Sequence, residues 1–190
     1  MSEGRLPSLK PPLSKRDWTR GPWDAPVALV EYVDFQCPCC QGSYATVERV
    51  LSGREGAVRF AVRHFPVRSV HRYAEGAALA AEAAGRQGKF WEMYHALLQP
   101  RGRIAPEDLE FHARQLDLDL DRFHRDLESE ELRAKLLEDK QWALRSGLNA
   151  TPTLFINGLR YDHRSCPVKE EELRAALEAA RREATLPLAA

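Results

Sequence analysis

Three of the four cysteines lie within four residues, and this cluster is best suited to do chemistry. Cys37, Cys39 and Cys40 belong to the segment Cys-Pro-Cys-Cys, while Cys166 stands alone. On a helix, Cys37 and Cys40 would lie one turn apart on the same face. Pro38 suits the first helical position because its missing N–H would have no partner there, and the remaining N–H groups stabilise negative charge. We therefore expect Cys37 to be a nucleophilic thiolate and Cys40 its resolving thiol.

The remaining cysteines leave an alternative open. Adjacent Cα atoms lie ~3.8 Å apart, whereas a disulfide usually needs ~4.4–6.8 Å, so Cys39 is poorly spaced to pair with Cys40. Cys37 and Cys40 could instead join His163 and Cys166 in a zinc-type ligand set, as in a metal- or redox-sensing module. A proline at a strand-to-helix junction favours redox chemistry. We therefore expect no metal or other cofactor, and a free thiol at Cys166.

Composition excludes several classes of protein. The chain has 190 residues, 28 basic and 28 acidic side chains, and 44% apolar residues. A net charge of zero gives no reason to expect nucleic acid as a partner, and no apolar run approaches the ~20 residues that cross a bilayer. Residues 1–20 contain no apolar segment typical of a secretory signal, so we expect a cytoplasmic location.

The periodicity predicts a single α/β domain interrupted by helices. Strand-like segments are expected at residues 27–34, 57–65, 153–156 and 159–161, with Asn157-Gly158 forming the last turn. A helix should follow the cysteine segment, several more should fill the middle of the chain, and one should end it. We divide the chain into an irregular arm (1–24), a core (25–70 and 148–185) and a helical insertion (71–147).

Four segments then point to a known family. VEYVDFQCPCC, RHFPV, GKFWEMYHALL and NATPTLFING occur in this order. Together they resemble the DsbA-like disulfide oxidoreductases of the thioredoxin superfamily, from about residue 24 to residue 180. The resemblance implies a thioredoxin-like fold with a helical insertion between β-α-β and β-β-α halves. It also implies thiol–disulfide exchange with proteins or peptides, with glutathione or a thioredoxin-type reductant as a further partner.

The resemblance assigns roles to further residues. Thr151 and Pro152 match the family's cis-proline segment, which faces the first cysteine and lines the substrate groove. Glu31 matches a buried acid beneath the disulfide, where a raised pKa would suit a proton relay to the second cysteine. The counterparts of His64 and Phe65 lie near the groove.

One position departs from the family pattern. The best-known periplasmic members have a histidine immediately before the second cysteine, whereas this chain has Cys39, so their oxidant strength does not carry over. A reducing cytoplasm would favour a reductase or isomerase. A glutathione-linked transferase or isomerase is the alternative on this fold, but such relatives tend to carry serine at the nucleophile position.

Overall fold

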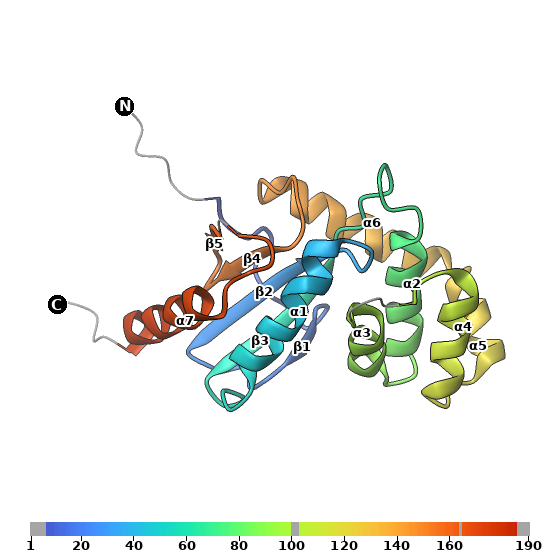
Figure 1. Cartoon of the computed structure of the whole chain (residues 1–190), viewed down its shortest axis with the longest axis horizontal. Helices are drawn as coiled ribbons and strands as arrows, with labels where there is room; N and C mark the ends of the chain where they lie inside the picture. The colour runs from blue at the N-terminus through green and yellow to red at the C-terminus, as the bar shows by residue number, and fades with distance from the viewer. Residues whose placement is uncertain (1–6, 100–102, 164, 186–190) are drawn as a thin grey trace.

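A computed structural model of the chain describes residues 7–99, 103–163 and 165–185. Parts of the predicted arm, insertion and core (1–6, 100–102 and 164) lie outside the described residues. The elements in chain order are β1 (Trp18–Arg20), β2 (Val27–Val33), α1 (Pro38–Leu51), β3 (Val58–His64), α2 (Ala74–Gly85), α3 (Phe90–Leu98), α4 (Pro106–Gln115), α5 (Leu120–Leu127), α6 (Glu130–Arg145), β4 (Thr153–Ile156), β5 (Leu159–Tyr161) and α7 (Glu170–Thr185) (Figure 1). This order confirms the predicted β-α-β half, helical block and β-β-α half.

The sheet topology brings distant segments to one edge. The strand order is β1-β3-β2-β4-β5, with β2 parallel to β3 and antiparallel to β4. Tyr32 near the end of β2 pairs with Thr153 at the start of β4. The chain that leaves β2 for the cysteines and the chain that enters β4 from Pro152 therefore meet.

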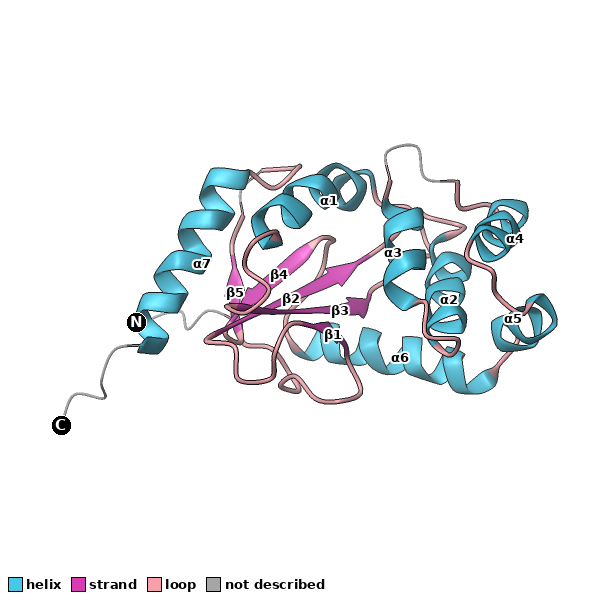
Figure 2. Ribbon diagram, turned by 90° about the horizontal axis from the view of Figure 1, so that it is seen from below, coloured by secondary structure: helices cyan, strands magenta, loops and turns pink. Residues whose placement is uncertain are grey.

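Helices cover both faces of the sheet. Helices α1 and α7 lie on one face, α6 runs along the other, and α2 to α5 gather at one end (Figure 2). Side chains in β2 alternate between two buried clusters, with Leu29 and Val33 facing the larger one and Val30 and Tyr32 facing the smaller one beneath α6. Although α6 falls inside the predicted insertion, it closes the second face of the sheet.

The N-terminal arm is more ordered than predicted. The prediction of an irregular arm is wrong for β1, which pairs antiparallel with β3. The arm also supplies Asp17, whose carboxylate Oδ1 lies 2.7 Å from Nε of the fully buried Arg63. Backbone carbonyls of Pro11 and Pro12 accept further hydrogen bonds from that guanidinium. The prolines hid the strand from sequence analysis, but the arm completes a buried charge network.

No helix in the described part of the chain is both long and apolar enough to cross a membrane.

Candidate active site around Cys37

The turn between β2 and α1 sets the position of the first cysteine. Cys37 caps α1 in an extended conformation, and Pro38 occupies the first turn of the helix. The Cys37 N–H donates to the backbone carbonyl of Asp34 at 3.0 Å. The Asp34 carboxylate accepts from the Gln36 N–H and from Nδ1 of His71, both at 2.8 Å. The roles of Asp34 and His71 leave no signal in the sequence, since their contact joins segments that are 37 residues apart.

The two cysteines of the motif differ in environment. Cys37 is 8% exposed and Cys40 is fully buried. A hydrogen bond from the Cys40 side chain is the main cause that lowers the pKa of Cys37, which is about 5. Burial opposes this shift, whereas the Thr151 side chain and the N–H groups of Cys40 and Cys39 add to it. Burial, the hydrogen bond to Cys37 and the charge of Glu31 raise the pKa of Cys40 well above its usual range. One thiolate and one thiol therefore coexist at neutral pH.

Alkylation should report this difference. We expect the rate at which iodoacetamide labels Cys37 in the folded protein to rise with a midpoint near pH 5, since the thiolate is the reacting form. In protein unfolded by urea the midpoint should move to roughly 8.5, the value of an ordinary thiol. Mass mapping after brief labelling identifies the modified residue. A midpoint near 8.5 in the folded protein would contradict the assignment.

Glu31 lies in β2, beneath the cysteines. It is on the same face of the strand as Val33, as their two-residue spacing predicts. Its carboxylate is buried, with Oε2 accepting from the Tyr94 hydroxyl at 3.0 Å and Oε1 without a hydrogen-bond partner among the described residues. Burial, only partly offset by the Tyr94 hydrogen bond, raises the pKa of Glu31 to about 7. A carboxyl with this pKa can both accept and release a proton near neutral pH.

A pocket lies beside the cysteine segment. The Thr151–Pro152 peptide bond is cis, and Sγ of Cys37 lies 3.3 Å from the Thr151 carbonyl oxygen. The pocket has a volume of about 350 Å³. Its lining includes Thr151, Pro152, His163, Cys39 and Cys166. The predicted facing pair, Cys37 and the Thr151–Pro152 segment, is thus brought together next to an open hollow.

Cys166 is not a free thiol, and that prediction is wrong. Cys39 and Cys166 form a disulfide across 127 residues of sequence, with Cα atoms 5.4 Å apart, whereas Cys37 and Cys40 are free. The connection between β5 and α7 passes over the start of α1, which brings Cys166 to Cys39. No local sequence pattern predicts a contact between Cys39 and Cys166.

The alternative ligand set of Cys37, Cys40, His163 and Cys166 is not available while this disulfide is closed, because Cys166 is already bonded. Both ring nitrogens of His163 face backbone carbonyls instead, those of Ser165 and Pro152, each at 3.0 Å. The four side chains therefore do not form the zinc-type site that their spacing allowed.

His64 and Phe65 lie in the core rather than along the pocket. Their exposed fractions are 1% and 7%, and neither side chain lines the pocket that holds Pro152. The sequence assigned them to the groove by resemblance alone. Their place near the groove therefore remains a prediction.

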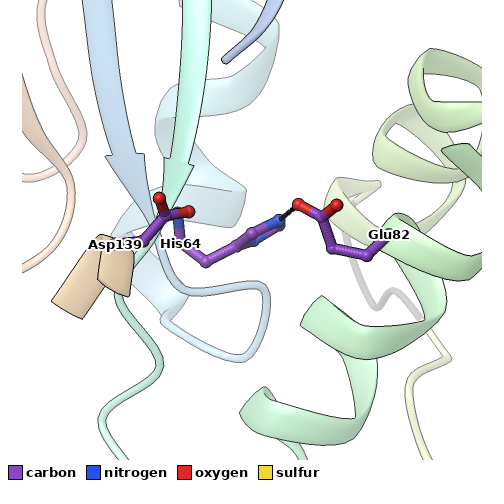
Figure 3. A group of neighbouring side chains, drawn as sticks. All are labelled: His64, Glu82 and Asp139. Atoms are coloured by element: carbon purple, nitrogen blue, oxygen red, sulfur yellow. Dashed lines mark hydrogen bonds and ion pairs between the residues drawn. The ribbon is translucent and has the colours of Figure 1, made fainter. Parts of the chain in front are cut away.

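His64 belongs instead to a buried group with Glu82 and Asp139, whose potential ligand atoms lie within 4.8 Å of one another (Figure 3). Its Nε2 lies 2.9 Å from Oε1 of Glu82, and its backbone N–H donates to Asp139. Nζ of Lys135 lies 2.6 Å from Oδ1 of Asp139. The Lys135 ammonium already balances the Asp139 carboxylate. These side chains therefore form a network of charged and polar groups that joins α2, β3 and α6.

Sequence relatives match this chain over part of their own length. The Na(+)/H(+) antiporter NhaA 1 of Salinispora arenicola is 43% identical over 95% of this chain and 27% of that protein. The Na(+)/H(+) antiporter NhaA 3 of Salinispora tropica is 42% identical over 94% of this chain and 27% of that protein. The chain therefore spans about a quarter of the length of these curated relatives.

Solved structures extend the comparison to the fold. A thioredoxin-like oxidoreductase from Silicibacter pomeroyi is 27% identical, with a TM-score of 0.78 over 89% of this chain and 94% of that one. BdbD from Bacillus subtilis is 21% identical, with a TM-score of 0.77 over 94% of this chain and 97% of that one. A model of the thioredoxin family matches residues 14–179. This chain therefore belongs to the thioredoxin family and has the thioredoxin-like fold of the DsbA-like oxidoreductases.

Proposed function

We propose that this chain is a thiol–disulfide oxidoreductase that acts on protein or peptide disulfides, with Cys37 as the attacking thiol and Cys40 as the resolving thiol. The observation that carries the proposal is the position of Cys37 at the start of α1, 3.3 Å from the Thr151 carbonyl oxygen, with the fully buried Cys40 one turn later. This arrangement lowers the pKa of Cys37 to about 5. A thiol with that pKa is ~99% thiolate at pH 7, compared with about 3% for an ordinary cysteine. With the Cys40 hydrogen bond as the main cause of this acidity, Cys37 is a nucleophile without an added base.

The exchange moves two electrons from the cysteine pair to the substrate. The Cys37 thiolate attacks one sulfur of the substrate disulfide, forms a mixed disulfide and releases the other sulfur as a thiolate. Cys40 then loses its proton and attacks Sγ of Cys37. This step forms the Cys37–Cys40 disulfide and releases the second substrate thiolate. The same steps in reverse oxidise a substrate dithiol.

We propose that Glu31 accepts the proton that Cys40 must lose. Its pKa of about 7 matches this task, and its charge acts directly on the Cys40 thiol. The hydrogen bond from the Tyr94 hydroxyl orients the carboxylate from α3. The unpartnered Oε1 is then the atom that remains open to receive a proton.

The pocket beside Pro152 suits an extended peptide. The backbone around Thr151 lies at the edge of the site, and the carbonyl oxygen of Thr151 is 3.3 Å from the Cys37 sulfur. An extended segment could hydrogen-bond to this backbone as a short added strand, with its disulfide next to Cys37. We propose Thr151 and Pro152 as substrate-binding residues and Pro38 and Cys39 as the supports that shape the helix start.

The reduction potential should reflect the acidity of Cys37. A thiolate with a pKa two units below pH 7 stabilises the reduced pair by about 3 kcal/mol, which corresponds to about 60 mV. We therefore expect the Cys37/Cys40 couple to be more oxidising than thioredoxin, whose potential is roughly −270 mV. Equilibration with glutathione buffers measures it. A more negative potential would contradict the role given to Cys37 acidity.

Catalysis of insulin reduction by dithiothreitol tests the proposed function. The untreated protein should accelerate the reaction well beyond dithiothreitol alone. Protein labelled at Cys37 by iodoacetamide near pH 6, and otherwise unmodified, is the matched control and should add nothing to the uncatalysed rate. Equal rates with labelled and unlabelled protein would overturn the proposal. Glutathione and a thioredoxin-type protein can then be compared as reductants.

The ion transport in the relatives' names describes whole proteins of which this chain matches 27%.

A further inference from the structure

We propose that the Cys39–Cys166 disulfide is a second redox site, separate from the Cys37/Cys40 pair. A thiol reductant opens it by attack on Cys166, and the closed disulfide holds one wall of the pocket beside Pro152. The redox step stands by itself, whereas its effect on substrate binding rests on the function proposed above.

Exposure separates the two pairs of cysteines. Cys166 is an exposed residue and Cys39 is half-buried, while both residues of the other pair are buried. Thiol–disulfide exchange needs a thiolate to approach one sulfur of the disulfide along an open path, and exposed disulfides are the labile ones. Because Cys166 is an exposed residue, we expect a thiol reductant in solution to reach this disulfide without unfolding of the chain. The disulfide is therefore accessible to reduction in the folded chain.

The structure also distinguishes the attacked sulfur from the leaving one. Cys166 is the more exposed residue of the pair, and Cys39 is the second residue of α1, after Pro38. A thiolate at the start of a helix is stabilised by the unpaired N–H groups, and a thiol of lower pKa leaves faster. Attack at Cys166 with departure of Cys39 is therefore the favoured direction.

Opening the Cys39–Cys166 disulfide consumes two equivalents of a thiol reductant. A reductant thiolate forms a mixed disulfide with Cys166 while Cys39 leaves as a thiolate and takes a proton from water. A second reductant thiolate then attacks the sulfur of the bound reductant, which forms the reductant disulfide and releases Cys166 as a thiolate that takes up a proton. In total, two reductant thiols become one disulfide, and the protein disulfide becomes two thiols. In the mixed-disulfide state, return attack by Cys39 closes the site again.

The disulfide fixes the segment that forms one side of the pocket. Between β5 and α7 the chain is held by the disulfide, by Nε2 of His163 at 3.0 Å from the Pro152 carbonyl, and by the Val168 N–H, which donates to Oγ of Ser43 at 2.9 Å. His163 and Cys166 line the pocket together with Pro152. Reduction leaves this wall held by these hydrogen bonds and by the packing of Val168 in the core, next to the backbone that touches the Cys37 sulfur.

A double variant isolates the second site. In Cys37→Ser/Cys40→Ser protein only Cys39 and Cys166 remain, so disulfide content across a glutathione redox series reports them alone. We expect one reversible two-electron transition, measured by alkylation and mass, with the far-ultraviolet circular dichroism unchanged. In Cys39→Ser protein, oxidised glutathione should form a stable adduct on Cys166. A disulfide that reduces only in denaturant, as a structural crosslink would, overturns the proposal.

Hydrogen exchange tests the wall. Cys166→Ser should lose amide protection at residues 161–163, 165, 166 and 168, while the alkylation midpoint of Cys37 stays near pH 5. Ser43→Ala, which removes only the hydrogen bond to Val168, is the matched control and should lose less protection. Unchanged hydrogen exchange in Cys166→Ser would show that the disulfide does not hold this side of the pocket. Wild-type protein that fails to reduce insulin would refute the proposed function but leave the glutathione transition of the double variant standing.

Discussion

Replacing Cys37 with serine should reduce catalysed insulin reduction to the uncatalysed rate. A serine hydroxyl is not ionised at pH 7, so the ready nucleophile at the start of α1 is lost. The fold should persist, because the substitution is nearly isosteric at a helix cap, where serine is a favoured residue. Turnover measured beside circular dichroism separates the two effects. A folded Cys37→Ser protein with the wild-type rate would eliminate Cys37 as the nucleophile.

The companion variant, Cys40→Ser, should fail at a different step. Cys37 can still attack, but no thiol follows to release the substrate, so mixed disulfides should accumulate to nearly one per chain. Non-reducing electrophoresis and mass mapping after exposure to a disulfide-containing peptide measure the adduct. Its attachment to Cys39 or Cys166 rather than to Cys37 would reverse the assignment of attacking and resolving thiols.

Replacing Glu31 with glutamine should remove a pH dependence of stability. The folded protein holds the Glu31 proton up to about pH 7, whereas the unfolded chain releases it near 4.5. The folded state therefore binds more protons between these values, and the unfolding free energy of the wild type should fall as pH rises through that window. The full difference is about 3 kcal/mol. The unfolding free energy of Glu31→Gln lacks this decline. The difference in unfolding free energy between the variant and the wild type should therefore shift in favour of the variant from pH 4.5 to pH 8.

Urea unfolding at pH 5 and pH 8 measures that difference. Both proteins are kept in the same redox state, because ionisation of Cys37 has the opposite sign and cancels in the comparison. Tyr94→Phe is the matched control, since it removes the hydrogen bond that lowers the Glu31 pKa and should move the upper end of the window above pH 7. A constant difference between wild type and Glu31→Gln would show that Glu31 titrates normally.

The strands and the helix starts could be predicted because their signals are local. The apolar, β-branched run of β2, the proline after Cys37 and the Asn157-Gly158 turn each act within a few residues. Asn157 and Gly158 both have positive φ, as the tight turn between β4 and β5 requires. The arrangement of Cys37 and Cys40 follows from the same local rules.

The features that sequence analysis missed depend on contacts between distant segments. Cys39 meets Cys166 because the β5–α7 connection crosses α1, and His64 is buried because α2 supplies Glu82 and α6 supplies Asp139. A three-residue strand such as β1, between prolines and a glycine, has too few residues for a period to be visible. These contacts follow from the assembled fold and leave no spacing pattern in the chain.

The disulfide map of the wild-type protein at several glutathione redox ratios tests the central claim most directly. After an acid quench, alkylation and proteolysis, each pairing is identified by mass. The account predicts that Cys37 and Cys40 form a disulfide with each other that appears and disappears reversibly with the buffer. Absence of a Cys37–Cys40 disulfide at every ratio, or pairing of Cys37 with Cys39 or Cys166 instead, would contradict it.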